Sequence, residues 1–165
     1  MQSNNTKRIA LSGMLAAVAV VIMSLGGLIP VATYVCPMLC CITQFIVLCF
    51  CGRRLAWTWF CVVAILALLM SPDKEAVFVF IAIGYYPLIK QYLDRHKIRS
   101  LLKTLYFNAA ILTSYAIMIY LLGMQEVAAE NTELGIIGLV IILLLGNIAF
   151  FLLDRLLVIM AGKMR

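Results

Sequence analysis

The chain has 165 residues, of which 65% are hydrophobic and only 12% are charged, and its mean hydropathy is +1.11. Soluble domains are about 45–50% apolar and about 25% charged, so this composition excludes a soluble globular domain. A net charge of +6 would suggest nucleic-acid binding in a soluble protein. Here the basic residues flank apolar runs, where membrane topology and anionic lipid headgroups explain them.

Six apolar runs predict six membrane-spanning helices. In chain order they cover residues 9–28, 31–51, 55–70, 74–92, 101–123 and 134–160. Each is close to the ~20 residues that cross ~30 Å of hydrocarbon, and their unbroken apolar character is unlike the alternation of a membrane barrel. We therefore expect an all-α polytopic membrane protein with a single six-helix domain over residues 1–165.

Glycines and prolines mark the ends and the irregular points of these spans. Gly26, Gly27 and Pro30 end the first span, and so short a connection allows the first two spans to pack as a tight hairpin. Pro37 leaves open whether the second span is straight, bent or partly re-entrant. Pro87 predicts a kink in the second half of the fourth span, because proline removes a helical hydrogen bond.

The basic residues are distributed asymmetrically among the connections. Of the 13 Lys and Arg residues, all except Lys74 lie in or near the N-terminal segment, alternate connections and the C-terminal segment. The other connections hold Lys74 and the acids Asp73, Glu75, Glu126, Glu130 and Glu133. Because cytoplasmic loops collect Lys and Arg, this pattern predicts that both termini are cytoplasmic in a multi-pass protein of the plasma membrane.

The sequence offers little support for an enzyme. The spans, taken between the loop charges, contain no Asp, Glu, Lys or Arg, whereas proton-coupled pumps and intramembrane proteases need functional groups at that depth. The one histidine, His96, lies in a charged connection, and there is no phosphate-binding loop or nucleophile elbow. We expect no catalytic residues, no cofactor and no metal site.

All six cysteines lie in the second span or in the first part of the third. Cys36 and Cys40 share one helical face, but further metal ligands are missing nearby. The preferred interpretation is that these cysteines act as small apolar residues. A redox or metal role and a disulfide remain alternatives.

The connection before the fourth span, residues 71–75, is the densest charge cluster on the predicted outer side. Ser71 is expected to cap the following helix, with Pro72 in its first turn and acids near its positive N-terminus. Alternatively, the same charges form a rim that holds a polar ligand, and capping does not explain Lys74, the lone base on that side. A ligand role predicts that Lys74→Ala weakens ligand binding.

Polar and aromatic residues in the spans complete the candidate site. Gln44 lies near the middle of the second span and is a candidate for the floor of a cavity, because an amide in hydrocarbon needs a partner. Asn108 and Asn147 are assigned to helix packing, and Tyr85 and Tyr86 to anchoring at the membrane interface. The predicted substrate-binding residues, as aromatic wall, polar floor and charged rim, are Tyr34, Gln44, Asp73, Lys74, Glu75 and Tyr120.

The first span is rich in small residues. Ser12 with Ala16 and Gly13 with Ala17 form two small-xxx-small pairs, which allow another helix to approach closely. One interpretation is packing within the bundle. The other is docking of a partner membrane subunit on Ser12, Gly13, Ala16 and Ala17.

Two regions of the chain are informative: the opening run from Lys7 to Ala17 and, later, the pairs Gly146-Asn147 and Asp154-Arg155. Together with the size of the chain and its number of spans, these regions resemble the S components of energy-coupling-factor (ECF) transporters. The resemblance implies a vitamin-like solute held in an outward cavity that the outer loops close. It also implies partnership with a transmembrane coupling subunit and two ATPases. Family members contact the coupling subunit through an Ala-xxx-Ala pattern on the first helix, from which this chain departs.

The expected function is therefore substrate capture for an ECF-type transporter, without ATPase activity of its own. One rival is a non-transporting scaffold subunit of an envelope-assembly complex, since rod-shape membrane proteins have a comparable size and number of spans. A second rival, a membrane enzyme or a lipid-handling protein, is disfavoured by the shortage of acid–base groups near the bilayer.

Overall fold

The computed structural model describes the backbone of residues 2–26, 32–94, 99–121 and 125–163, and the side chains of residues 5–26, 33–90, 92–94, 100–120 and 143–163. His96 and the side chains of Glu126, Glu130 and Glu133 lie outside the described residues. Within the described residues the chain is all-helical, as the sequence predicts. In chain order the elements are α1 (Gln2–Leu25), α2 (Ala32–Cys51), α3 (Arg53–Met70), α4 (Lys74–Ile83), α5 (Tyr86–Leu93), α6 (Arg99–Ala116), the π-helical η2 (Ile117–Leu121) and α7 (Gln125–Lys163).

Five helical segments are long and apolar enough to cross a membrane, judged by length and composition. They are Asn5–Leu25, Thr33–Cys51, Arg53–Met70, Ser100–Tyr120 and Leu143–Lys163. Large apolar side chains also cover the outside of the bundle, and Met14, Leu69 and Leu152 are 70%, 75% and 66% exposed. Such surfaces are unfavourable in water and suited to lipid, which indicates a membrane protein.

The fourth predicted span is two short helices. α4 ends at Ile83, and α5 begins at Tyr86 after a turn at Gly84 and Tyr85. The sequence predicted a kink at Pro87, and the interruption lies just before that residue. The physical reason is that proline has no N–H to donate to the carbonyl of Ile83, one turn earlier. By contrast, α2 continues through Pro37 without interruption.

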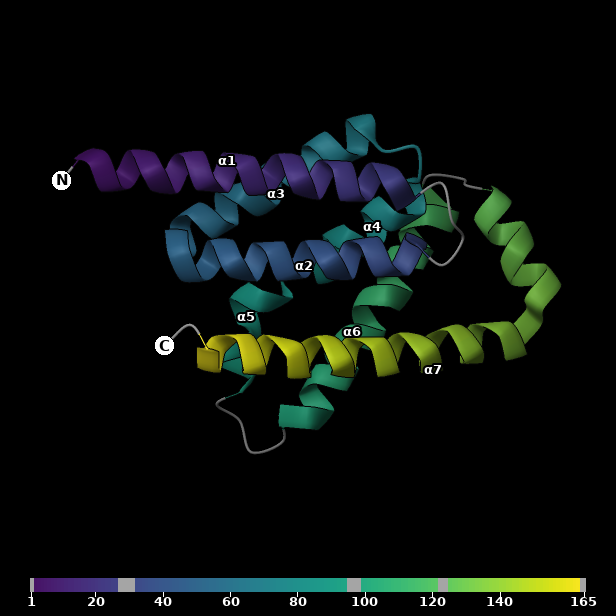
Figure 1. Ribbon diagram of the computed structural model, residues 1–165. Coiled ribbons are helices and arrows are strands. Elements are labelled where there is room, and N and C mark those ends of the chain that lie inside the picture. The colour runs from purple at the N-terminus through teal and green to yellow at the C-terminus, as the bar shows by residue number, and fades with distance from the viewer. Residues whose placement is uncertain (1, 27–31, 95–98, 122–124, 164–165) are drawn as a thin grey trace.

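The helices form one bundle in which α2 and α4 are central. α2 packs against α1 and α3 on one side and approaches α7 on the other, as Figure 1 shows. One buried cluster joins α1–α4, with Leu88 of α5, around Met23, Val47 and Phe80. A second joins α2 and α4–α7 around Phe107 and Phe150. Because α2 and α4 contribute to both clusters, they hold the two halves of the bundle together.

The two ends of the bundle differ in charge. At the basic end, which holds Arg8, Arg53 and Arg155, the Cys51 thiol donates to the carbonyl of Arg8 at 3.3 Å and so ties α2 to the first turns of α1. At the acidic end, which holds Asp73 and Glu75, the Ser71 hydroxyl donates to the carbonyl of Met23 at 3.0 Å. The early part of α1 and the late part of α7 both point toward the basic end (Figure 1).

α2 and α3 are joined by a single glycine. Gly52 has a φ of 90°, which is the left-handed region where side chains are strained. Its N–H donates to the carbonyl of Leu48 at 3.2 Å, and its own carbonyl accepts from Ala56 at 3.0 Å. One glycine therefore ends α2 and starts α3.

α7 is longer than the predicted sixth span, because it begins at Gln125 instead of near residue 134. Figure 1 shows its first part (green) turned away from the direction of the rest. The added stretch is rich in Glu, Ala and Gln, which favour the helical conformation. This polar segment, which we expected to be a connection between spans, is therefore helical.

Gly84 fits its position because no side chain has room there. A Cβ at this residue would lie 2.5 Å from the carbonyl oxygen of Phe80 and 2.8 Å from a ring carbon of Phe60. We therefore expect Gly84→Ala to lower the free energy of unfolding by about 1–3 kcal/mol, the usual cost of overpacking. The matched control is Gly162→Ala in α7, where no atom lies within 4 Å of the added methyl. Equal unfolding free energies for the two variants in detergent would contradict this account.

Candidate functional site

Three polar side chains from three helices meet at the acidic end. Tyr34 of α2 and Tyr115 of α6 both donate to Oε1 of Glu75 in α4, at 3.1 Å and 2.5 Å. The two tyrosine hydroxyls also contact each other. We call Tyr34, Glu75 and Tyr115 the Glu75 cluster. All three side chains are half-buried, so the cluster is packed between helices and yet reachable from outside.

The charged residues next to Glu75 make hydrogen bonds that stabilise the connection between α3 and α4. Asp73 is the N-cap of α4, with Oδ1 accepting from the N–H of Ala76 at 3.0 Å and Oδ2 from the hydroxyl of Thr33 at 2.8 Å. The expectation that Ser71 caps this helix is therefore wrong, because α4 starts later, at Lys74, and Ser71 instead ends α3.

Lys74 points back to the preceding helix. Its ammonium donates to the carbonyls of Leu68 at 2.7 Å and Ser71 at 2.9 Å. A cation at the negative C-terminus of a helix is stabilising, and these carbonyls have no partner in the helix itself. The contacts thus favour the structural interpretation of Lys74 over a direct ligand contact.

A cavity of about 380 Å³ lies between α4 and α6. One of its lining residues is Phe78, which lies one helical turn after Glu75 on α4. The cavity therefore begins one turn along α4 from the Glu75 cluster. Ser114, the chain neighbour of Tyr115, also lines it, and the buried hydroxyl of Ser114 has no hydrogen-bond partner among the described residues. The other lining residues are Ile81, Ala82, Tyr85, Tyr106, Ala109, Ala110, Thr113 and Ile117.

Of the predicted substrate-binding residues, the structure brings Tyr34, Asp73, Lys74 and Glu75 to one end of the bundle. Gln44 is fully buried in α2, and neither its amide oxygen nor its nitrogen has a partner in the described part of the chain. It does not line the cavity between α4 and α6. Tyr120 is 89% exposed in η2 and is not part of the Glu75 cluster. Sequence reasoning missed Tyr115, which no local pattern distinguishes from the other tyrosines.

The two small-residue pairs of α1 lie in different environments. Ala16 is buried in the core, and Ser12 donates its hydroxyl to the carbonyl of Ile9 in its own helix. Gly13 and Ala17 lie on the exposed side of α1, and a Cβ at Gly13 would meet nothing within 4 Å. The docking hypothesis therefore stays a prediction for Gly13 and Ala17, while Ala16 serves packing within the bundle.

The two asparagines do serve helix packing. Nδ2 of Asn147 in α7 donates to Oδ1 of Asn108 in α6 at 2.7 Å and to the carbonyl of Leu143 at 2.8 Å. Each amide thus finds a partner inside the bundle, as buried amides require. The prediction for this pair is confirmed.

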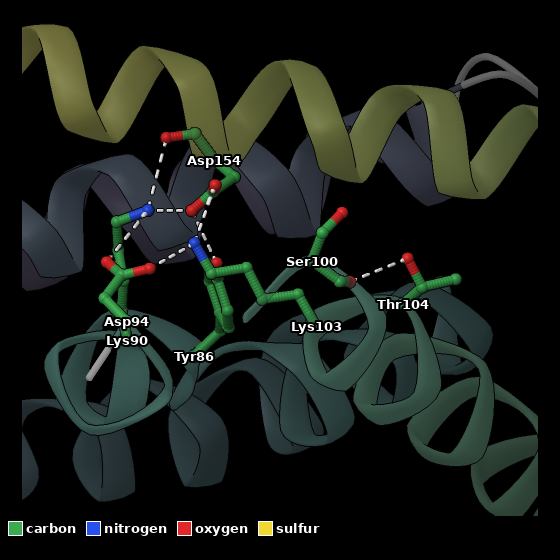
Figure 2. A network of polar contacts seen from close by, with 7 residues as sticks. All are labelled: Tyr86, Lys90, Asp94, Ser100, Lys103, Thr104 and Asp154. Atoms are coloured by element: carbon green, nitrogen blue, oxygen red, sulfur yellow. Dashed lines mark hydrogen bonds and ion pairs between the residues drawn. The ribbon is translucent and has the colours of Figure 1, made fainter. Parts of the chain in front are cut away.

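A second polar network lies at the basic end, where α5, α6 and α7 meet (Figure 2). The carboxylate of Asp154 pairs with Lys90 and, at 2.9 Å, with Lys103, and it accepts from the hydroxyl of Tyr86 at 2.5 Å. Asp94 pairs with the same two lysines, at 3.9 Å and 2.5 Å. We call these five residues the Asp154 network. The side chains of Lys90 and Lys103 are only 8% and 9% exposed.

This network corrects two expectations. Tyr86 is fully buried and bonded to Asp154, so it does not anchor the membrane interface. Lys90 and Lys103 are not only topology signals in solvated connections, because they are buried against acids of α5 and α7. The signal in the sequence that could have identified them is the presence of two acids, Asp94 and Asp154, in the same basic regions.

Neither the thiols nor the possible metal ligands of the described residues form a further site. All six cysteines are free, and four of them, Cys36, Cys40, Cys41 and Cys51, are buried. Within the described residues no group of three or more His, Cys, Asp or Glu side chains is placed to hold a metal ion.

Comparison with known proteins found no matching family model, no matching curated protein and no matching solved structure.

Proposed function

We propose that this chain captures a small polar solute at its acidic end, as the membrane-embedded substrate-binding subunit of an ECF-type transporter for a vitamin-like compound. The observation that carries the proposal is the Glu75 cluster above the cavity between α4 and α6. Polar groups from three helices converge there, next to a space of about 380 Å³. Small-molecule sites commonly have volumes of about 300–1,000 Å³ and combine an apolar lining with a few polar groups.

The chemistry of this region suits an amphipathic solute with hydrogen-bond donors. The Glu75 carboxylate and the two tyrosine hydroxyls supply acceptors and a negative charge, while Phe78, Ile81 and Ile117 supply apolar walls. The hydroxyl of Ser114 adds a buried polar group with a free hydrogen-bonding capacity among the described residues. A ligand would satisfy this group, and an unsatisfied buried hydroxyl is otherwise unfavourable.

The proposal includes a topology and partners. In it, α4 and α5 together make the fourth of six crossings of the plasma membrane, and the basic end faces the cytoplasm. The acidic end, with the Glu75 cluster, then faces outward. A transmembrane coupling subunit with two ATPases would dock on the exposed side of α1, where Gly13 and Ala17 leave room for close helix approach.

The test is whether filling the cavity removes a bound solute. We expect native mass spectrometry of the purified protein to retain a small non-lipid molecule, and Ala110→Phe to abolish its retention because the ring occupies the cavity. The matched control is Val62→Phe on the exposed side of α3. Solute retained equally by both variants, or absent from the wild type purified from cells, would contradict solute capture.

Co-purification separates this proposal from its rival. Isolation with an ATPase pair supports a transport subunit, whereas isolation with cell-wall synthesis enzymes supports an envelope-assembly scaffold. Gly13→Leu should weaken the first association, because a large side chain blocks close approach on the exposed side of α1.

A further inference from the structure

A groove between α6 and α7 begins beside the Asp154 network. A space of about 580 Å³ is lined there by Ser100, Lys103 and Arg155 together with Phe151. Its remaining lining residues are Asp94, Asp154 and Val158. In Figure 2, Ser100, Lys103 and Thr104 lie on the side of α6 that faces α7. This part of the groove is polar and lies at the basic end of the bundle.

An apolar space of about 400 Å³ continues the groove along α7. It shares Phe151 and Arg155 with the polar part, so the two spaces are contiguous. Beyond these shared residues it is lined by Thr104, Leu144, Asn147, Ile148 and Leu152. Arg155 and Leu144 are eleven residues apart, or about 17 Å along a helix, which is close to half of the ~30 Å hydrocarbon thickness of a bilayer.

The polar part has one positive charge in excess when it is counted together with Lys90, which does not line it but pairs with its two acids. Lys90, Lys103 and Arg155 face two acids, Asp94 and Asp154, which leaves one positive charge in excess. The two acids are engaged by the two lysines. Arg155 is exposed and makes no ion pair within the described residues. Its guanidinium is therefore available to an anion at the opening of the groove.

We propose that this groove binds one phospholipid with an anionic headgroup from the leaflet at the basic end. Arg155 and the Ser100 hydroxyl hold the phosphate. One acyl chain lies along Phe151, Ile148 and Leu144. The groove has positive charge at one end, which continues into an apolar channel about as long as one leaflet is deep. This combination fits a lipid better than a soluble anion, because a soluble anion would use only the polar end. The site lies at the other end of the bundle from the Glu75 cluster and does not depend on solute capture.

The experiment measures lipid selectivity of the purified full chain. Delipidated protein in detergent is offered an equimolar mixture of dioleoyl phosphatidylglycerol and dioleoyl phosphatidylcholine, and bound lipid is quantified by native mass spectrometry. We expect the wild type to prefer phosphatidylglycerol by about fivefold, the effect of one basic residue beside an anionic headgroup. Arg155→Gln should remove this preference. The matched control, Lys163→Gln, removes an exposed basic residue of the same helix that does not line the groove and should keep the preference.

Two further arms make the result decisive. Ile148→Asn, in the apolar part, should lower retention of both lipids, and thermal unfolding identifies any variant that has lost its fold. Millimolar inorganic phosphate should not displace phosphatidylglycerol. The proposal is overturned if the wild type shows no preference, if Arg155→Gln and Lys163→Gln have equal effects, or if inorganic phosphate competes fully and so identifies a free-anion site.

Discussion

Replacing Asp154 with asparagine is expected to lower the free energy of unfolding by about 3–5 kcal/mol, the usual effect of removing one partner from a buried ion pair. The carboxylate pairs with both Lys90 and Lys103, whose side chains are almost completely buried. Without it, the two ammonium groups share only Asp94, whose side chain is 34% exposed. The remaining positive charges are close together and poorly solvated, so their repulsion adds to the lost attraction.

Reversible unfolding in mixed detergent and SDS micelles, followed by circular dichroism, measures this effect. Asp94→Asn serves as the control, because Asp94 binds the same lysines from a more exposed position and its loss should cost less than half as much. A triple variant with Asp154→Leu, Lys90→Met and Lys103→Met should regain most of the lost stability, because the charge that it leaves without a partner in the network, that of Asp94, is on a side chain that is 34% exposed and can be solvated. An Asp154→Asn protein as stable as the wild type would show that the network is solvated.

The sequence predicted the helical class and most helix positions, because hydropathy and helix length dominate in a membrane protein. It also predicted an irregularity near Pro87, but not its location at Gly84 and Tyr85. The missing N–H of Pro87 explains a break before that residue, and at the break itself Gly84 packs against the ring of Phe60 from α3. Such a contact joins residues far apart in the chain, and no local pattern reports it.

The charged residues show the same limit more clearly. Lys90, Lys103 and Asp154 are in regions where basic residues report topology, and that interpretation needs no knowledge of packing. Their burial depends on α5, α6 and α7 meeting at the basic end, where Asp154 is 51 residues from Lys103. By contrast, the helix-packing role of Asn108 and Asn147 was predicted, although not that they pair with each other, because an amide inside an apolar helix requires a partner.

The candidate site was predicted in part. The loop at residues 71–75 and Tyr34 were identified from charge and position, and the structure places Tyr34 against Glu75. Tyr115 was not identified, because it lies within the fifth predicted span and no local pattern distinguishes it from the other tyrosines. Lys74 looked functional because it was the lone base on its side, yet its contacts with the end of α3 account for it.

If the Glu75 cluster holds the solute, Glu75→Gln should weaken solute binding by about ten- to a hundredfold. The glutamine keeps the size of the side chain and removes its charge, which weakens the bonds from Tyr34 and Tyr115 and the attraction for a donor on the solute. Hydrogen bonds to charged groups contribute about 1.5–3 kcal/mol, which corresponds to that range of dissociation constants. Isothermal titration of the solute identified by native mass spectrometry measures the effect.

Two neighbouring variants distinguish binding from structure. Lys74→Ala should lower the unfolding temperature while changing affinity little, because the ammonium contacts carbonyls at the end of α3 and not the Glu75 cluster. Tyr120→Phe should change neither property, because Tyr120 is exposed and outside the cluster. A Glu75→Gln protein that binds the solute as tightly as the wild type would remove the carboxylate from the site. Weaker binding by Lys74→Ala than by Glu75→Gln would return the ligand role to the lysine, since only direct contact with the solute explains a loss larger than that of the central carboxylate.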